Sequence, residues 1–213
     1  MTYWTEATMG LYSDYIFPHL LEFALGRGYP MKYRNRALEE ARGEVLEIGF
    51  GTGLNLSCYP PGVTRLTLID PARHLSRKVA RRIAAAGFPV EMAHLDAARL
   101  PFEPERFDTV VSTWTLCTIP HVEAALVEVR RVLKPDGRFL FLEHGRSTNE
   151  KVARRQDRWN SVQRVVGCGC NLNRPIDRLI ESAGLRVDRL ERFLMPKSPR
   201  ITADHYLGSA VVS

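Results

Sequence analysis

A glycine-rich segment and three acidic side chains are the residues of this sequence whose types and spacing best fit ligand chemistry. The segment from Val45 to Asn55 reads Val-Leu-Glu-Ile-Gly-Phe-Gly-Thr-Gly-Leu-Asn, and Glu47 stands two positions before its first glycine. Such a turn between a strand and a helix lets the backbone approach a ligand closely. A carboxylate there would repel a pyrophosphate, whereas it suits a cationic or zwitterionic ligand.

Two further acidic residues follow the next two predicted strands. Asp70 ends the apolar segment Leu66–Ile69, and Asp96 follows the segment Pro89–Ala93. Open α/β sheets bind ligands outside the carboxyl ends of their strands, where a carboxylate after the second strand can accept ribose hydroxyls. Each acid alone could cap a helix, and Asp70 before Pro71 fits that role well. Three acids at consecutive strand ends instead favour a site for a nucleoside.

The elements that must position these residues follow from short apolar runs that alternate with helical stretches. The predicted strands are Val45–Ile48, Leu66–Ile69, Pro89–Ala93, Phe107–Ser112, Arg138–Glu143, Leu185–Leu194 and His205–Val212, and the predicted helices are Arg73–Ala86, Val122–Leu133 and Arg174–Ala183. Only a short proline-containing loop joins the last two strands, so these must pair antiparallel. We therefore predict an α/β fold with a doubly wound, Rossmann-like, seven-stranded, mostly parallel sheet and a C-terminal antiparallel strand pair.

The 213 residues have the length and composition of one ordinary globular domain. We expect a helical lid over residues 1–42, a cofactor-binding core over 43–145, an insertion and helix over 146–184, and the strand pair over 185–213. No uncharged apolar run approaches the roughly 20 residues that span a bilayer, and the first residues do not resemble a secretory signal. The sequence therefore favours a cytoplasmic protein without a transmembrane helix.

Together, these motifs resemble those of the class I S-adenosylmethionine-dependent methyltransferases. The resemblance rests on Glu47-x-Gly49-x-Gly51-x-Gly53, Asp70, Asp96-Ala97 and Leu133-Lys134-Pro135-Asp136-Gly137-Arg138, and it covers residues 43–213. It implies S-adenosyl-L-methionine as the cofactor, with the glycines under its methionine part, Asp70 at the ribose and Asp96 at the adenine. The implied cofactor-binding residues are Glu47, Gly49, Phe50, Gly51, Gly53, Asn55, Asp70, Pro71, Asp96, Ala97, Thr113 and Trp114.

The methyl acceptor is indicated by a narrower resemblance. The peptide Cys170-Asn171-Leu172 with Arg174, after a strand that ends in Glu143-His144, resembles a methyltransferase-like group within this class. Members of that group act on small thiols, and their relatives methylate lipid amines or quinone-precursor rings. We therefore expect a small thiol as the acceptor, with a lipid amine or a quinone precursor as the alternative. The alternative of a different class is a non-catalytic nucleoside-binding regulatory domain.

Residues that could take part in the chemistry lie at the ends of the fourth and fifth strands. His144 is a candidate general base, and Cys170 is a second candidate catalytic residue. Trp114 is either a buried packing residue or part of the wall of the acceptor chamber. Cys168 and Cys170 are spaced Cys-x-Cys without a second pair, a pattern unlike that of common zinc sites, so we expect no metal.

The distribution of charge along the sequence indicates which binding partners are expected. The net charge is +6, from 30 Lys and Arg against 24 Asp and Glu, and residues 146–164 carry a dense basic run. Together with the apolar stretch Tyr15–Leu25, this run favours either a lid over the cofactor or peripheral contact with an anionic membrane surface. Aromatic residues do not interleave with the basic run, so we expect a small or lipid-like acceptor as the partner and no nucleic acid.

Overall fold

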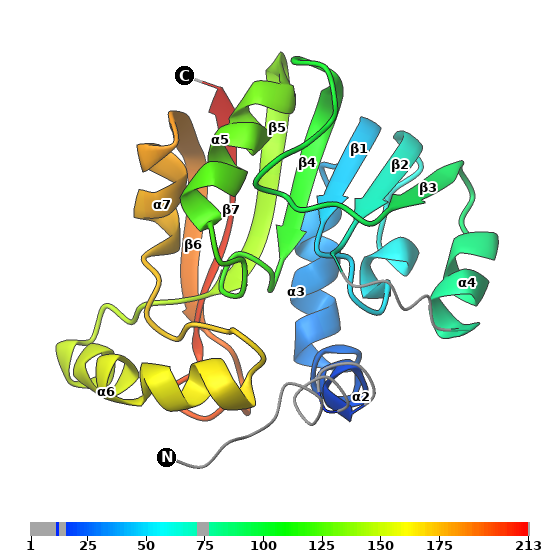
Figure 1. Ribbon diagram of the computed structural model, residues 1–213. Coiled ribbons are helices and arrows are strands. Elements are labelled where there is room, and N and C mark those ends of the chain that lie inside the picture. The colour runs from blue at the N-terminus through cyan, green and yellow to red at the C-terminus, as the bar shows by residue number, and fades with distance from the viewer. Residues whose placement is uncertain (1–11, 13–15, 72–76, 213) are drawn as a thin grey trace.

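The computed structural model describes Tyr12, residues 16–71 and residues 77–212, and its centre is a twisted sheet with helices on both faces (Figure 1). The strands are β1 (Gly43–Ile48), β2 (Val63–Ile69), β3 (Val90–Ala93), β4 (Phe107–Thr113), β5 (Leu133–His144), β6 (Leu185–Leu194) and β7 (Asp204–Val212). They form one seven-stranded sheet in the order β3-β2-β1-β4-β5-β7-β6. Strands β1 to β5 pair in parallel, and β7 lies antiparallel between β5 and β6. The predicted sheet and its terminal antiparallel pair are confirmed.

Two hydrophobic cores lie on opposite faces of this sheet because successive residues of a strand point to opposite sides. The helices are α2 (Phe17–Leu25), α3 (Tyr29–Leu38), α4 (Arg77–Ala84), α5 (Val122–Val132), α6 (Glu150–Val166) and α7 (Ile176–Ser182). In β1, Leu46 and Ile48 are buried in the core that includes α5 and α7. Val45 is buried in the other core, with Leu38 of α3 and Val79 of α4. The strands are therefore covered on both sides, as their nearly continuous apolar runs predict.

The glycine-rich segment is interpreted as a turn between a strand and a helix, and the prediction of a helix directly after it is wrong. The structure has only a single 3-10 turn there, η2 (Leu54–Ser57). The physical reason is the pair Pro60-Pro61, because a proline disfavours helical geometry in the residue before it. The helix expected to begin at Arg73 is described from Arg77, and residues 72–76 lie outside the described residues. The fifth strand begins at Leu133, beside Phe107 of β4, and so starts earlier than predicted.

Helices α2 and α6 lie at one end of the molecule, beyond the carboxyl ends of β1 and β4 (Figure 1). A hydrogen bond of 2.9 Å from the Tyr12 hydroxyl to the Val166 carbonyl joins the N-terminal segment to α6. Residues 1–11 and 13–15, which include the start of the apolar stretch, lie outside the described residues. Within residues 16–71 and 77–212, no helix is long and apolar enough to cross a membrane.

Candidate active site

The glycine-rich loop follows β1 and turns through the left-handed region of backbone space. Gly49, Gly51 and Gly53 have φ angles of 69°, 51° and 74°. A Cβ atom at Gly49 would lie 2.2 Å from Cγ2 of Thr115, so only glycine fits against the segment after β4. A Cβ atom at Gly51 would meet nothing within 4 Å, so the loop faces open space at this point. The loop is therefore packed tightly on one side and leaves a cradle for a ligand on the other.

The predicted acidic residues after β2 and β3 lie along this same edge of the sheet. The N–H of Gly51 donates to Oδ2 of Asp70 at 3.2 Å, which brings this carboxylate directly to the glycine loop. The N–H of Asp70 donates to the Ala93 carbonyl at 3.3 Å, and this bond ties the end of β2 to that of β3. Asp96 follows β3, and its Oδ1 accepts the N–H of Ala98 at 2.9 Å. The two carboxylates thus follow neighbouring strands in the order that a nucleoside lying along the edge would need.

Glu47, the third predicted acid, lies beneath the loop rather than on its open side. Its side chain is buried, and Oε2 accepts the Tyr59 hydroxyl at 2.7 Å. Burial raises the pKa of Glu47 to about 7, although the Tyr59 hydrogen bond and the nearby Arg34 guanidinium act in the opposite direction. Glu47 therefore holds Tyr59 and the Asn55 side chain in place, and its part in cofactor binding stays a prediction.

Arg34 of α3 is the main residue of the site that the sequence did not reveal. Its Nη1 donates to Oδ1 of Asn55 at 2.5 Å and to Oγ1 of Thr113 at 2.9 Å. Its guanidinium carbon lies 4.7 Å from the ring centroid of Trp114. Burial lowers the pKa of this arginine. A buried cation from the N-terminal helix thus joins the turn after β1 to the end of β4.

No sequence signal separates Arg34 from its neighbour Arg36, which carries the same side chain two positions later. Arg36 lies at the surface in an ion pair with Glu191, whereas Arg34 is 4% exposed. The partners of Arg34 become adjacent only when the sheet forms, so spacing along the chain could not have identified it.

Trp114 begins the loop that follows β4 and contacts two basic side chains. Its backbone is left-handed, with a φ of 52°, and its side chain is half-buried beside Arg34. Its Nε1 donates to Nε2 of His205 at 2.9 Å, and Nδ1 of His205 donates to the Ala203 carbonyl at 2.8 Å. Burial lowers the pKa of His205 to about 4, so this imidazole is neutral at pH 7 and can accept the indole proton. His205 fixes Trp114 at the rim of the site.

Glu143, the residue before His144, holds the rest of that loop. One oxygen, Oε1, accepts the Ser112 hydroxyl at 2.7 Å and the N–H groups of Thr115 and Leu116 at 2.9 and 3.1 Å. The hydroxyl of Thr115 in turn donates to the Gly49 carbonyl at 3.2 Å. The loop after β4 is therefore bound both to the end of β5 and to the glycine loop.

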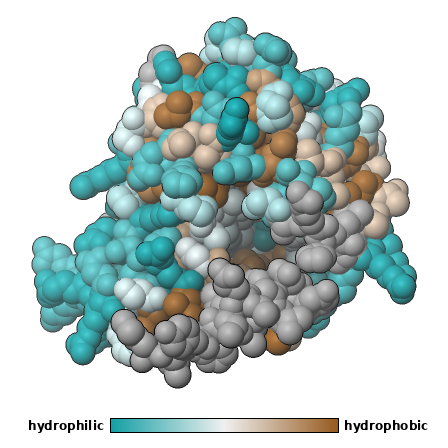
Figure 2. Space-filling model, in the orientation of Figure 1, coloured by the Kyte–Doolittle hydropathy of each residue, from teal (hydrophilic) through white to brown (hydrophobic). Residues whose placement is uncertain are grey.

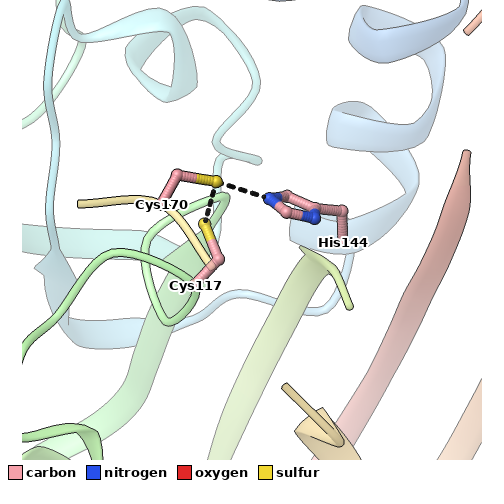
Figure 3. A group of neighbouring side chains, drawn as sticks. All are labelled: Cys117, His144 and Cys170. Carbon is pink, nitrogen blue, oxygen red and sulfur yellow. Dashed lines mark hydrogen bonds between the residues drawn. The ribbon is translucent and has the colours of Figure 1, made fainter. Parts of the chain in front are cut away.

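The two candidate catalytic residues, His144 and Cys170, lie together with a third residue, Cys117, and their side chains point toward one another (Figure 3). The Cys170 sulfur lies 3.0 Å from Nε2 of His144 and 3.8 Å from the Cys117 sulfur. The hydrogen bond to Cys117, together with burial, raises the pKa of the Cys170 thiol. Roles for His144 as a base and for Cys170 in catalysis stay predictions.

An open cavity of about 180 Å³ lies beside the glycine loop, between α2, α4 and η2. Glu22 of α2 lines it and pairs with Lys78 at 3.2 Å and with Arg82 at 2.9 Å. Arg82 also donates to the Thr52 carbonyl at 2.5 Å, so it ties both α2 and the glycine loop to α4. These contacts hold α2 next to the loop, where a lid over the cofactor would have to lie.

Comparison with known proteins agrees with this geometry. The family model described as "Methyltransferase domain" matches residues 46–141. Human thiol S-methyltransferase TMT1A is 33% identical over 184 residues, which cover 78% of this chain and 70% of that protein. Phosphatidylethanolamine N-methyltransferase of Cereibacter sphaeroides is 33% identical over 129 residues, or 59% of this chain and 63% of that protein. The structure of a Burkholderia thailandensis 1,6-didemethyltoxoflavin-N1-methyltransferase superposes with a TM-score of 0.69 at 17% identity, covering 100% of this chain and 92% of that one.

The chain belongs to the class I S-adenosylmethionine-dependent methyltransferases, and S-adenosyl-L-methionine is its cofactor. The resemblance read from its motifs is thereby confirmed. Within this class it is similar to thiol S-methyltransferases over most of its length. The open cradle at Gly51 and the carboxylates after β2 and β3 fit such a cofactor.

Proposed function

We propose that this enzyme transfers the methyl group of S-adenosyl-L-methionine to the sulfur of a small thiol. The observation that carries the proposal is the similarity to a thiol S-methyltransferase, which extends over 78% of the chain and beyond the residues of the common methyltransferase domain. The region outside that domain model contains Cys170 and the terminal strands, which complete the edge of the sheet near His144.

The cofactor lies over the glycine loop in this proposal. Asp70 accepts the ribose hydroxyls, Asp96 and the backbone at Ala97 hold the adenine, and Thr113 and Trp114 flank the methionine part. Bound cofactor supplies a methyl group on a sulfonium, whose carbon is already activated toward a nucleophile. The protein then has to align the acceptor and exclude water, which is where most of the rate enhancement arises.

The acceptor approaches from the side of the loop after β4. This loop has the glycine loop on one side, through Thr115 and Gly49, and the cluster of Cys117, His144 and Cys170 on the other. An acceptor bound along the loop after β4 would be next to the half-buried ring of Trp114, the first residue of this loop. Soft sulfur atoms and an aromatic ring suit a polarizable, partly apolar acceptor such as an alkyl thiol.

A panel of acceptors tests this assignment. The enzyme is given methyl-labelled cofactor with an alkyl thiol, with the matching alcohol and amine, with phosphatidylethanolamine vesicles and with a quinol. We expect label in the thioether at a rate at least about tenfold above that for the alcohol and amine, because thiolates are the better nucleophiles. Label in the phospholipid or the quinol alone would contradict the thiol assignment and favour the alternative acceptor. Absence of label in every acceptor would favour a non-catalytic nucleoside-binding domain.

We also propose that α2 and α6 contact an anionic membrane surface. Phe23 of α2 is 71% exposed, and Trp159 and Val166 of α6 are more than half exposed. In Figure 2, a few hydrophobic residues are visible at the lower edge of the molecule, the end at which α2 and α6 lie in Figure 1. Exposed arginines of α6, among them Arg155 and Arg158, add positive charge there. A lipid-soluble acceptor could then reach the active site directly from the membrane.

A further inference from the structure

Cys117, His144 and Cys170 form a group whose potential metal ligands converge. One sulfur or nitrogen atom from each lies within 4.8 Å of the other two. The two sulfurs are 3.8 Å apart, and the Cys170 sulfur is 3.0 Å from Nε2 of His144. Zn–S bonds of about 2.3 Å and Zn–N bonds of about 2.0 Å at tetrahedral angles place two sulfurs about 3.8 Å apart and a sulfur and a nitrogen about 3.5 Å apart. The sulfurs already have this separation, and the Cys170 sulfur and the His144 nitrogen would move about 0.5 Å apart. The Cys117 sulfur and the imidazole nitrogen, which lie within 4.8 Å of each other, would close to about 3.5 Å.

The three residues come from segments that the fold holds rigidly against one another. Cys117 lies in the loop after β4, which Glu143 fixes from the end of β5. The Asn171 side chain donates to the Cys117 carbonyl at 2.9 Å, and the Asn171 N–H donates to the same oxygen at 2.8 Å, which fixes Cys170 beside it. His144 is the last residue of β5 and pairs with β7. A ligand set held in this way binds a metal without first having to order its own backbone.

The ligand types and their number indicate which ion fits. Two sulfurs and an imidazole nitrogen select zinc over magnesium or calcium, which take oxygen ligands. Structural zinc sites have four protein ligands, whereas catalytic ones have three and keep the fourth position open. Cys168, the partner that the Cys-x-Cys spacing suggests, is not part of the group. The group instead joins Cys170 to Cys117, 53 residues away, and so differs from the pair on which the expectation of no metal was based.

We propose that Cys117, His144 and Cys170 bind one zinc ion whose fourth coordination position takes the sulfur of the acceptor thiol. Both cysteines bind as thiolates, and the imidazole binds through Nε2.

The chemical use of this site rests on the proposed thiol acceptor. A thiol that binds zinc loses its proton to solvent and stays a thiolate at neutral pH. A sulfur lone pair of this thiolate forms the new S–CH₃ bond while the bond between the methyl carbon and the sulfonium breaks and leaves its electron pair on the donor sulfur. The thioether product is a weaker ligand than the thiolate and leaves the zinc. The metal would thereby do the work otherwise assigned to a general base.

Metal binding by the purified, reduced full chain tests the site without reference to activity. After metal removal and titration with zinc, we expect about one tightly bound ion per chain, and a sulfur-to-metal charge-transfer band when cobalt replaces zinc. The variants Cys117→Ser, Cys170→Ser and His144→Ala should each weaken zinc binding by at least about tenfold. Cys168→Ser is the matched control, because it removes a thiol two positions from Cys170 and should bind zinc as the wild type does. Cofactor binding by each variant verifies that it is folded.

The outcomes separate the metal site from the proposed function. A reduced wild-type protein that binds no zinc, or variants that bind it as well as Cys168→Ser, would overturn the metal site. Equal rates of thiol methylation with and without zinc would overturn its activating role, for which we expect a loss of at least about tenfold on metal removal. A protein that binds zinc through these residues but methylates no thiol would contradict the proposed function and leave the metal site standing.

Discussion

Arg34 of helix α3 donates a 2.9 Å hydrogen bond to Oγ1 of Thr113 at the end of β4, 79 residues further along the chain. The same nitrogen donates to Asn55, next to the glycine loop. This buried cation therefore fixes the N-terminal helix to the edge of the sheet at which we propose that the cofactor binds. If the N-terminal helices form a lid over the site, Arg34 holds that lid in position. Losing its hydrogen bonds should therefore both destabilise the fold and change the shape of the site.

Replacing Arg34 by methionine should destabilise the protein strongly. The change removes the charged donor to Asn55 and Thr113 in a buried site, and losing two such hydrogen bonds costs about 3 kcal/mol or more of unfolding free energy. Arg36→Met is the matched control, since its exposed ion pair with Glu191 should be worth less than about 1 kcal/mol. Urea unfolding measures both. If both variants lose the same unfolding free energy, the buried contacts of Arg34 stabilise the fold no more than the exposed ion pair of Arg36 does.

The variant Glu47→Gln should change how stability depends on pH. The folded pKa of Glu47 is raised to about 7, above the 4.5 of an ordinary glutamate, so the fold prefers the neutral acid. Its contribution is fully present below pH 4.5 and is lost as the pH rises through 7. Glutamine does not titrate, so the loss of unfolding free energy relative to wild type should be about 2 kcal/mol greater at pH 5 than at pH 8. Denaturant titrations at the two pH values measure this difference, and the same loss at both would contradict a raised pKa.

The variant His205→Gln should have the opposite pH dependence. The pKa of His205 is lowered to about 4 from 6.5, so the fold prefers the neutral imidazole. Its contribution is present above pH 6.5 and is lost as the pH falls toward 4. Glutamine keeps an acceptor for Trp114 but does not titrate. The unfolding free energy of the variant relative to wild type should therefore be about 2 kcal/mol higher at pH 5 than at pH 8. A change of the same sign as that of Glu47→Gln, in the same denaturant titrations, would refute this assignment.

Asp70→Ala should weaken cofactor binding. The carboxylate lies at the glycine loop, where it would accept ribose hydroxyls, and losing such charged hydrogen bonds costs about 1.5 to 3 kcal/mol, or about tenfold or more in Kd. Asp136→Ala removes the same charge from an exposed position near the start of β5, and it should bind normally. Isothermal titration with S-adenosylhomocysteine compares the two. Unchanged affinity in Asp70→Ala would remove Asp70 from the binding site.

Membrane contact through α2 and α6 should be salt-sensitive and should depend on Phe23. At low salt, wild-type protein should sediment with anionic vesicles, and a salt concentration of about 1 M should release much of it, because screening weakens the arginine contribution. Phe23→Ser should reduce binding, whereas Val127→Ser removes another exposed apolar side chain, one from α5, and should not. A wild-type protein that stays in solution with vesicles at low salt would exclude this contact.

The predicted residues that the structure brings together at one edge of the sheet share one property, since each comes from the turn after a strand. Gly51 and Asp70 could be assigned to one edge because a parallel sheet brings the carboxyl ends of its strands together. Arg34 and His205 could not, because each reaches Trp114 only through packing between segments far apart in the chain.

Contacts between distant segments also explain why the sequence did not predict which cysteines lie together. Cys168 and Cys170 are close in sequence, yet Cys170 lies beside Cys117 because Asn171 docks on the loop after β4. The helix after the glycine loop was expected from the usual strand–turn–helix pattern, and the prolines that follow shorten it to one turn. Local pattern therefore predicted the edge of the sheet well, while contacts between distant segments completed the site.

The most direct test of the account is transfer of a deuterated methyl group from labelled S-adenosyl-L-methionine to a small alkyl thiol, followed by mass spectrometry of the products. We predict a thioether that carries the intact labelled methyl group, formed by the wild-type enzyme and the Asp136→Ala control, and formed at least about tenfold more slowly by Asp70→Ala at limiting cofactor. A thiol that stays unmethylated by a folded enzyme with bound cofactor would contradict the account.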